Sequence, residues 1–156
     1  MLCVISPLTI PIGTTVVSLA TLVMYIAALT FDWGILCTAV LLYICMGIVG
    51  LPVFAGFTSG LTHLLGPMGG FIIGYLPMCF VISLIRMRAC KICFPIAMFI
   101  GTILLYACGG IWMIVWTDLD IYGVLSVCVL PYIPIDVIKI VIALLSAPAI
   151  KKFNRI

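Results

Sequence analysis

Two ionisable residues lie inside an otherwise apolar segment near the C-terminus, PIDVIKIVIALL at 134–145. Asp136 and Lys139 are three residues apart, so a helix places both side chains on one face. Pro134 suits the first helical position, which puts Asp136 in the first turn near the positive end of the helix dipole. Charged groups at membrane depth are costly and mark functional sites by default. The pair therefore predicts either a ligand site with one acceptor and one donor, or an ion pair that only fixes the helix start.

A second stretch, from 47 to 74, is dense in glycine and proline yet contains no formally charged residue (GIVGLPVFAGFTSGLTHLLGPMGGFIIG). Turns of soluble proteins are usually polar because they lie in water. In a membrane protein, irregular backbone is tolerated only where it lies against protein or lines a cavity. We therefore interpret this stretch as a cap or wall of a small-molecule site.

The remaining reactive side chains give weaker signals. Cys90 and Cys93 form a lone CxxC beside several cations, and a metal or redox role needs a second pair or a nearby histidine. His63 lies in a different loop, where a hydrogen bond to backbone is the favoured interpretation. Tyrosines and tryptophans in apolar runs are more often membrane-belt or core residues than ligand contacts. Motifs for phosphate binding, nucleophilic hydrolysis or zinc are absent from the sequence, so we expect no catalytic residue, metal or cofactor.

Composition sets the class of protein. Hydrophobic residues make up 67% of the 156 residues and charged residues 7%, with a mean hydropathy of +1.52. Soluble domains are about a quarter charged. The sequence therefore predicts a mostly helical integral membrane protein with a single transmembrane domain over 1–156. The net charge of +3 comes from a few cations at the edges of apolar runs, a pattern of membrane topology rather than nucleic-acid binding.

The apolar runs predict a short helical segment followed by five helices. The segment at 1–6 is too short to span a bilayer, and we interpret it as the end of a helix whose beginning is absent. Prolines at 7 and 11 predict an extended link over 7–15. The helices are expected at 16–31, 35–49, 71–85, 92–116 and 121–147, the last with a break at 131–134.

The cations predict the orientation of these helices. The basic connector at 86–91 and the basic tail at 151–155 are expected on the cytoplasmic side, together with the C-terminus. The irregular segments at 7–15, 50–70 and 117–136 then meet on the outer face. This convergence predicts a site that opens to the outside of the plasma membrane.

Three motifs carry a resemblance to a known family. GLPVFAG at 50–56, LLGPMGGFIIGY at 64–75 and VLPYIPIDVIK at 129–139 resemble the BioY family, the biotin-binding S components of energy-coupling-factor (ECF) transporters. The order and spacing agree over nearly the whole chain, although Met68 stands where the family commonly has threonine. The resemblance implies an all-α integral membrane protein, a six-helix S-component-like bundle with the first helix largely truncated. It also implies biotin as substrate and the ECF transmembrane coupling subunit and ATPase subunits as partners.

The chemistry of biotin suggests roles for the residues in these motifs. Its ureido head carries two N–H donors and one acceptor, its rings are apolar, and its tail is ionised. Asp136 would accept from the head and Lys139 would donate to it, within apolar walls. The walls are expected from Phe54, Tyr75 and the close backbone approach that glycine allows at Gly56, Gly60, Gly69 and Gly70. The glycines could instead serve only helix packing.

Two other functions remain open from the sequence. An S component for another small vitamin would keep the fold and change the pocket. A membrane-embedded enzyme or redox carrier would use Cys90 and Cys93. Ligand binding without metal or turnover separates the S components from the latter class.

Overall fold

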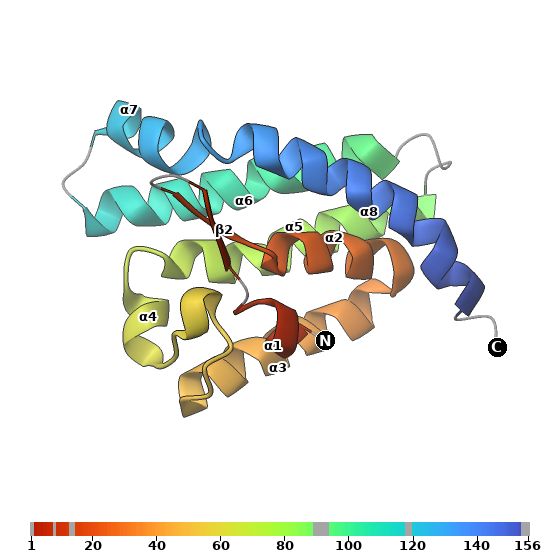
Figure 1. The fold of residues 1–156 in the computed structure, drawn as a ribbon, viewed down its shortest axis with the longest axis horizontal. Coiled ribbons are helices and arrows are strands. Elements are labelled where there is room, and N and C mark those ends of the chain that lie inside the picture. The colour runs from red at the N-terminus through yellow and green to blue at the C-terminus, as the bar shows by residue number, and fades with distance from the viewer. Residues whose placement is uncertain (1, 8, 13–14, 89–93, 118–119, 154–156) are drawn as a thin grey trace.

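The computed structural model describes residues 2–7, 9–12, 15–88, 94–117 and 120–153. Its long helices form a bundle, and a short β-ribbon lies near the N-terminus (Figure 1). The elements in chain order are α1 (Leu2–Ile5), β1 (Thr9–Ile12), β2 (Thr15–Ser18), α2 (Ala20–Thr30), α3 (Trp33–Val49), the 3-10 turn η1 (Ala55–Phe57), α4 (Leu61–Leu65), α5 (Gly69–Arg88), α6 (Phe94–Trp116), α7 (Ile121–Val124), the π-helical turn η3 (Leu125–Val129) and α8 (Ile133–Phe153).

The expected link and helix start near the N-terminus need correction. Strands β1 and β2 pair antiparallel, from Thr9 opposite Ser18 to Ile12 opposite Thr15, so described residues that were expected in a simple extended link form a β-ribbon. The helix expected at 16–31 begins only at Ala20. Threonine and valine are β-branched and favour strands, which explains why residues 15–18 join the ribbon instead of the helix. The Ala20 N–H donates to Ser18 Oγ (3.1 Å) where the strand gives way to α2.

Other helix boundaries also differ from the predicted ones. Helix α3 begins two residues earlier than the expected 35–49, and α5 extends beyond 71–85 at both ends. The segment expected as one broken helix over 121–147 consists of α7, η3, a turn at 130–132 and α8, which continues to Phe153. Alanine and leucine near its end favour helix, so α8 continues beyond the most apolar part of this segment. The start expected at 92 and the whole CxxC lie outside the described residues.

The core lies where α2, α5, α6 and α8 meet. Met24, Tyr25, Met78 and Met98 are fully buried there. Helices α5 and α6 pack along most of their lengths. Their close approach depends on Gly101, where a Cβ would come 2.7 Å from the Ile82 side chain.

The outer surface of the bundle is strongly apolar. Helices α5, over Gly69–Met87, and α6 are long and apolar enough to cross a membrane, whereas α2 and α3 are shorter apolar helices. Large side chains such as Leu42, Val115 and Leu145 are exposed on these helices and on α8. Water would disfavour such a surface, and lipid would not.

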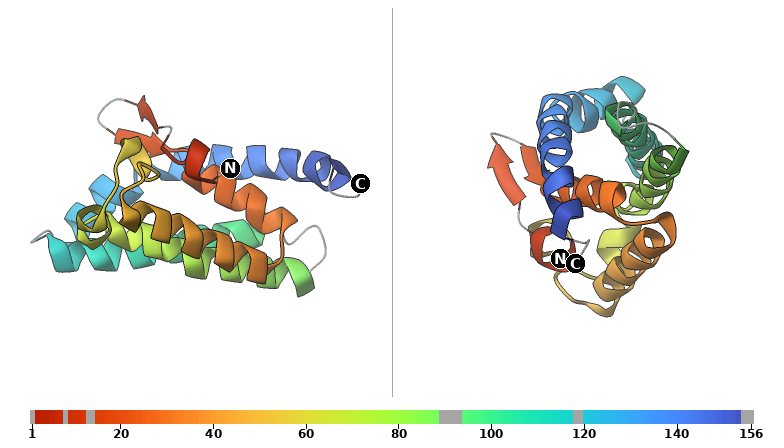
Figure 2. Two further views of the ribbon diagram at one scale, coloured as in Figure 1. Left: turned by 90° about the horizontal axis from the view of Figure 1, so that it is seen from below. Right: turned by 90° about the vertical axis from the view of Figure 1, so that its right-hand side faces the viewer.

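The two ends of the bundle differ. Helices α4 and α7 lie at one end, whereas the α2–α3 turn and the C-terminal part of α8 lie at the other (Figures 1 and 2). At the second end, Arg86 Nη2 donates to Asp32 Oδ1 (2.6 Å) and Nη1 donates to the Leu29 carbonyl (3.0 Å). Arg86 thereby joins the end of α5 to the end of α2. The irregular segments at the first end surround a cavity.

Candidate ligand-binding site

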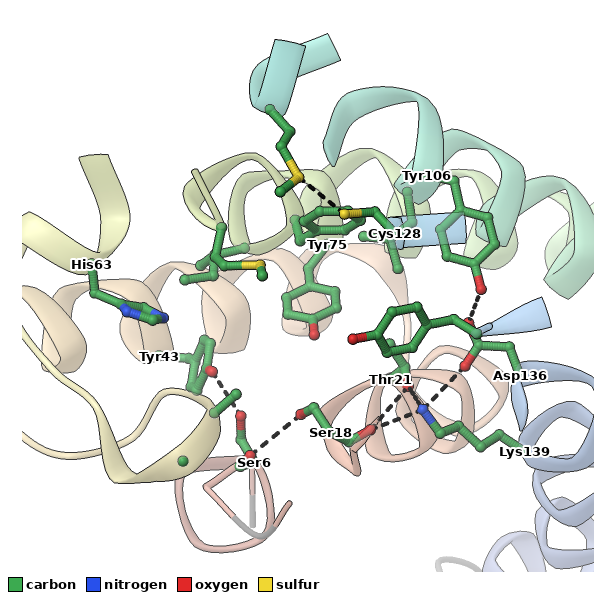
Figure 3. Close-up of a pocket in the computed structure, with 18 residues that line it drawn as sticks. Ser6, Ser18, Thr21, Tyr43, His63, Tyr75, Tyr106, Cys128, Asp136 and Lys139 are labelled. Atoms are coloured by element: carbon green, nitrogen blue, oxygen red, sulfur yellow. Dashed lines mark hydrogen bonds and ion pairs between the residues drawn. The ribbon is translucent and has the colours of Figure 1, made fainter. Parts of the chain in front are cut away.

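A cavity of about 530 Å³ lies among α2, α3, α5, α6 and α8, toward the end that carries α4 (Figure 3). Its volume is in the range of small-molecule sites. The walls are mainly apolar and aromatic with a few polar groups, and the lining consists of Ser6, Ser18, Thr21, Tyr43, Ala55, Gly56, His63, Met68, Phe71, Ile72, Tyr75, Leu105, Tyr106, Met113, Cys128, Tyr132, Asp136 and Lys139.

Lys139 is held on several sides. It lies in α8, is 6% exposed, and its Nζ is 3.0 Å from Asp136 Oδ1. The same Nζ donates to the Ser18 carbonyl (2.9 Å) and to Thr21 Oγ1 (2.7 Å). All three N–H directions of the ammonium therefore have protein groups near them. The end of β2 and the start of α2 supply two of these groups, so the β-ribbon helps to position the charge.

Asp136 keeps unused acceptor capacity. The residue is 4% exposed, and Tyr106 from α6 donates its hydroxyl hydrogen to Oδ2. Oδ1 is buried and in ion-pair contact with Lys139, but it accepts no hydrogen bond from any residue that the structure describes. A carboxylate oxygen can accept more than one hydrogen bond. The site thus presents a buried carboxyl acceptor beside a mainly apolar cavity.

Tyrosine hydroxyls supply the polar groups that the sequence analysis missed. Tyr43 from α3 is hydrogen-bonded to Ser6 Oγ (2.7 Å), and Tyr106 bonds to Asp136. Tyr132, in the turn before α8, also lines the cavity. In the sequence these residues look like membrane-belt or core aromatics. Of these three, only Tyr132 lies within one of the sequence motifs that resemble the family.

His63 lies on the cavity wall and its ring stacks on Phe54, with 5.6 Å between ring centroids and a 22° interplanar angle. Partial burial lowers the pKa of its imidazole from the ordinary value of 6.5. The expected hydrogen bond to backbone is not found among the described residues. The imidazole therefore lines the cavity without a side-chain hydrogen bond to any residue that the structure describes.

The sequence-predicted site residues divide into two groups. Asp136, Lys139, Gly56 and Tyr75 line the cavity, and Phe54, Gly60, Gly69 and Gly70 do not. Phe54 is fully buried behind the wall, edge-on to Tyr43 at 5.5 Å.

The glycines outside the lining serve the backbone. A Cβ on Gly69 would overlap the Leu64 carbonyl, and one on Gly70 would overlap the Trp112 side chain. These two contacts favour the packing interpretation of the GPMGG motif. Gly60 has a φ of +96°, a conformation that side chains rarely adopt. Its role is therefore to let the loop turn into α4.

The structure does not test a metal or redox role for the CxxC motif. Cys90 and Cys93 lie outside the described residues. Among the residues that are described, no group of three or more His, Cys, Asp or Glu side chains could hold a metal ion.

Comparisons with known proteins all find similarity to the BioY family or to a biotin S-component. The model of the BioY family matches residues 1–155. The biotin transporter BioY2 of Lactococcus lactis is 34% identical over 144 residues, which is 91% of this chain and 79% of that protein. The biotin transporter BioY of Thermotoga maritima is 32% identical over 147 residues, with 94% and 87% covered. The crystal structure of an S-component for biotin from an ECF-type ABC transporter superposes with a TM-score of 0.86 at 23% identity, over 97% of this chain and 85% of that one, which shows the same fold.

Proposed function

The chain belongs to the BioY family, and we propose that it is the biotin-binding S component of an ECF transporter. The family membership confirms the resemblance of the three sequence motifs. Relatives that share about a third of their residues over most of their length are biotin transporters. The function is therefore binding and transport of a vitamin, with no chemical change to it.

The observation that carries the proposal is the buried Asp136 carboxylate beside the apolar cavity. Its Oδ1 accepts no hydrogen bond from the described residues, and a ureido N–H is a donor of the right kind. A carboxyl oxygen can accept more than one hydrogen bond, so a ligand that donates to Oδ1 beside its contact with Lys139 gains affinity from the added hydrogen bond. The bicyclic rings of biotin match the apolar side chains of Phe71, Ile72 and Leu105 along the wall.

Lys139 has a more indirect role in this proposal than the sequence suggested. Its ammonium already contacts Ser18, Thr21 and Asp136. Its contact with Oδ1 orients the Asp136 side chain. It could reach the ureido carbonyl only by exchanging one of these contacts, such as its hydrogen bond to Thr21 Oγ1.

The proposed assembly follows from the family and the surface. The chain is a membrane protein, and we propose a multi-pass, six-helix S-component arrangement in the plasma membrane with the C-terminus in the cytoplasm. The apolar exposed faces and the spans in α5 and α6 support this arrangement. The positive-inside rule favours an outward-facing cavity. Uptake would require an ECF transmembrane coupling subunit and ATPase subunits.

Mass spectrometry of the purified chain tests the substrate. Protein produced in biotin-replete cells should carry biotin, and calorimetry on ligand-free protein should give one site. A different vitamin in the preparation would retain the S-component class and reject biotin. Folded protein that neither carries nor binds biotin would overturn the proposed function.

A further inference from the structure

The cavity carries a second chemical feature away from the Asp136–Lys139 pair. In Figure 3, His63 and this pair lie on opposite sides of the pocket. His63 comes from α4, and its imidazole contacts the Phe54 ring. Within the described part of the chain the two ring nitrogens have no hydrogen-bond or ion-pair partner. An imidazole in this position can donate to a ligand, accept from it, or take up a proton.

The charges in the lining limit what can meet an anionic ligand. Asp136 and Lys139 compensate each other at 3.0 Å. Among the lining residues, His63 is then the side chain that could supply an uncompensated positive charge. A carboxylate that leaves water without a partner pays a desolvation cost of several kcal/mol. Biotin is elongated, so a ureido head at Asp136 directs its acid tail toward the other side of the cavity.

We propose that protonated His63 binds the carboxylate of the ligand tail, so that binding of a carboxylate ligand is coupled to the uptake of a proton by His63. The proposal rests on the proposed function, because it assumes that the ureido head lies at Asp136. It also makes His63 a residue that selects acids over neutral analogues of the same shape.

Other titratable groups near His63 do not account for proton uptake on binding between pH 5 and 8. Tyr43 of α3 and Tyr75 of α5 line the same cavity, and Cys3 packs with the cluster around Phe54. Tyrosine and cysteine ordinarily titrate near 10 and 8.5. Asp136 and Lys139 face the cavity from the side of α8. A histidine is the side chain whose ordinary titration falls between pH 5 and 8.

The direction of the pH effect follows from the burial of the imidazole. Partial burial lowers the pKa of His63 in the free protein, and a bound carboxylate raises it. Binding is then tightest below the pKa of the free protein. It weakens as the pH rises through that value and levels off above the pKa of the complex. An opposite charge at close range shifts a pKa by about 1–3 units, and each unit corresponds to a tenfold change in affinity.

Calorimetry on the full chain in lipid nanodiscs tests the proposal with two probes, biotin and biotinamide, whose tail is neutral. The dissociation constant for biotin should be about tenfold higher at pH 8 than at pH 5.5. Titrations in buffers of different ionisation enthalpy should show net proton uptake for biotin. Biotinamide should show neither effect.

The variant His63→Gln isolates the histidine from every other group that titrates in this range. It should bind biotin and biotinamide with similar affinities and lose the pH dependence. Thr62→Ser, on the same short helix and outside the lining, is the matched control and should retain it. Melting temperatures show that each variant is folded.

Two results would overturn the proposal while the proposed function stands: equal pH slopes for the parent and His63→Gln, or the same slope for biotinamide as for biotin. Absence of biotin binding at every pH would instead reject the proposed function, and the role of His63 with it.

Discussion

Two ion pairs use the same chemistry in different surroundings. Asp136 and Lys139 are 3.0 Å apart, and their side chains are 6% and 7% exposed. Arg86 and Asp32 are 2.6 Å apart, but Asp32 is 73% exposed. A solvated pair contributes about 0–1 kcal/mol, whereas removing one partner of a buried pair costs about 3–5 kcal/mol. Distance alone therefore says little about the importance of an ion pair.

The partners of the two pairs differ as well. Arg86 connects the ends of α5 and α2, because its guanidinium donates hydrogen bonds to both Asp32 and the Leu29 carbonyl. Asp136 retains an oxygen without a hydrogen bond from the described residues and faces a cavity. The first pair joins two helix ends, and the second lines the cavity. Substitutions at both pairs test this contrast.

The largest effect is expected from Asp136→Ala. It leaves Lys139 buried without its anionic partner, so stability should fall by about 3–5 kcal/mol and biotin binding should be lost. Thermal unfolding in detergent and calorimetry measure the two effects. A variant as stable as the parent would mean that the Lys139 ammonium finds enough compensation in Ser18 and Thr21.

The double variant Asp136→Asn with Lys139→Met separates ligand binding from the stability of the pair. Both charges disappear and the side-chain volumes are nearly kept, so the melting temperature should remain close to that of the parent. Losing a charge-assisted hydrogen bond to the ligand costs about 1.5–3 kcal/mol, or roughly one to two decades in dissociation constant. Unchanged affinity in a folded double variant would make the pair purely structural.

The substitution Gly70→Val tests a residue near the site that packs rather than binds. Its added side chain meets Trp112, and overpacking costs about 1–3 kcal/mol. Stability and membrane yield should therefore fall, while the protein that remains folded should bind biotin with near-parental affinity. Normal stability with abolished binding would instead favour the direct role of this glycine at the ligand.

The smallest effect is expected from Asp32→Ala. The exposed carboxylate contributes at most about 1 kcal/mol, and Arg86 keeps its bond to the Leu29 carbonyl. Stability should change little, the change should shrink further at high salt, and biotin affinity should stay the same. A loss of stability as large as that of Asp136→Ala would show that the two ion pairs contribute equally to stability.

Much of the fold could be predicted from local patterns. The long apolar runs indicate α3, α5 and α6 to within a few residues, because a membrane helix must satisfy its backbone within itself. The pairing of residues 9–12 with 15–18 was not predicted, because a two-stranded ribbon of apolar residues resembles an extended link followed by a helix. The i, i+3 spacing was sufficient to predict that Asp136 and Lys139 lie on one helix face, and it left open whether they form an ion pair or a ligand site.

The sequence by itself therefore determined the class of protein, the apolar helices, the family and the local pair on α8. Only the tertiary structure decided which residues surround the cavity. Tyr43, His63 and Tyr106 come from three different helices, and no spacing rule connects them to Asp136. The same holds for Gly69 and Gly70, whose contacts with Leu64 and Trp112 depend on how the loop and helices pack. Hydropathy and helical periodicity act along the chain, whereas a cavity is formed by residues far apart in sequence, so packing alone assigns its walls.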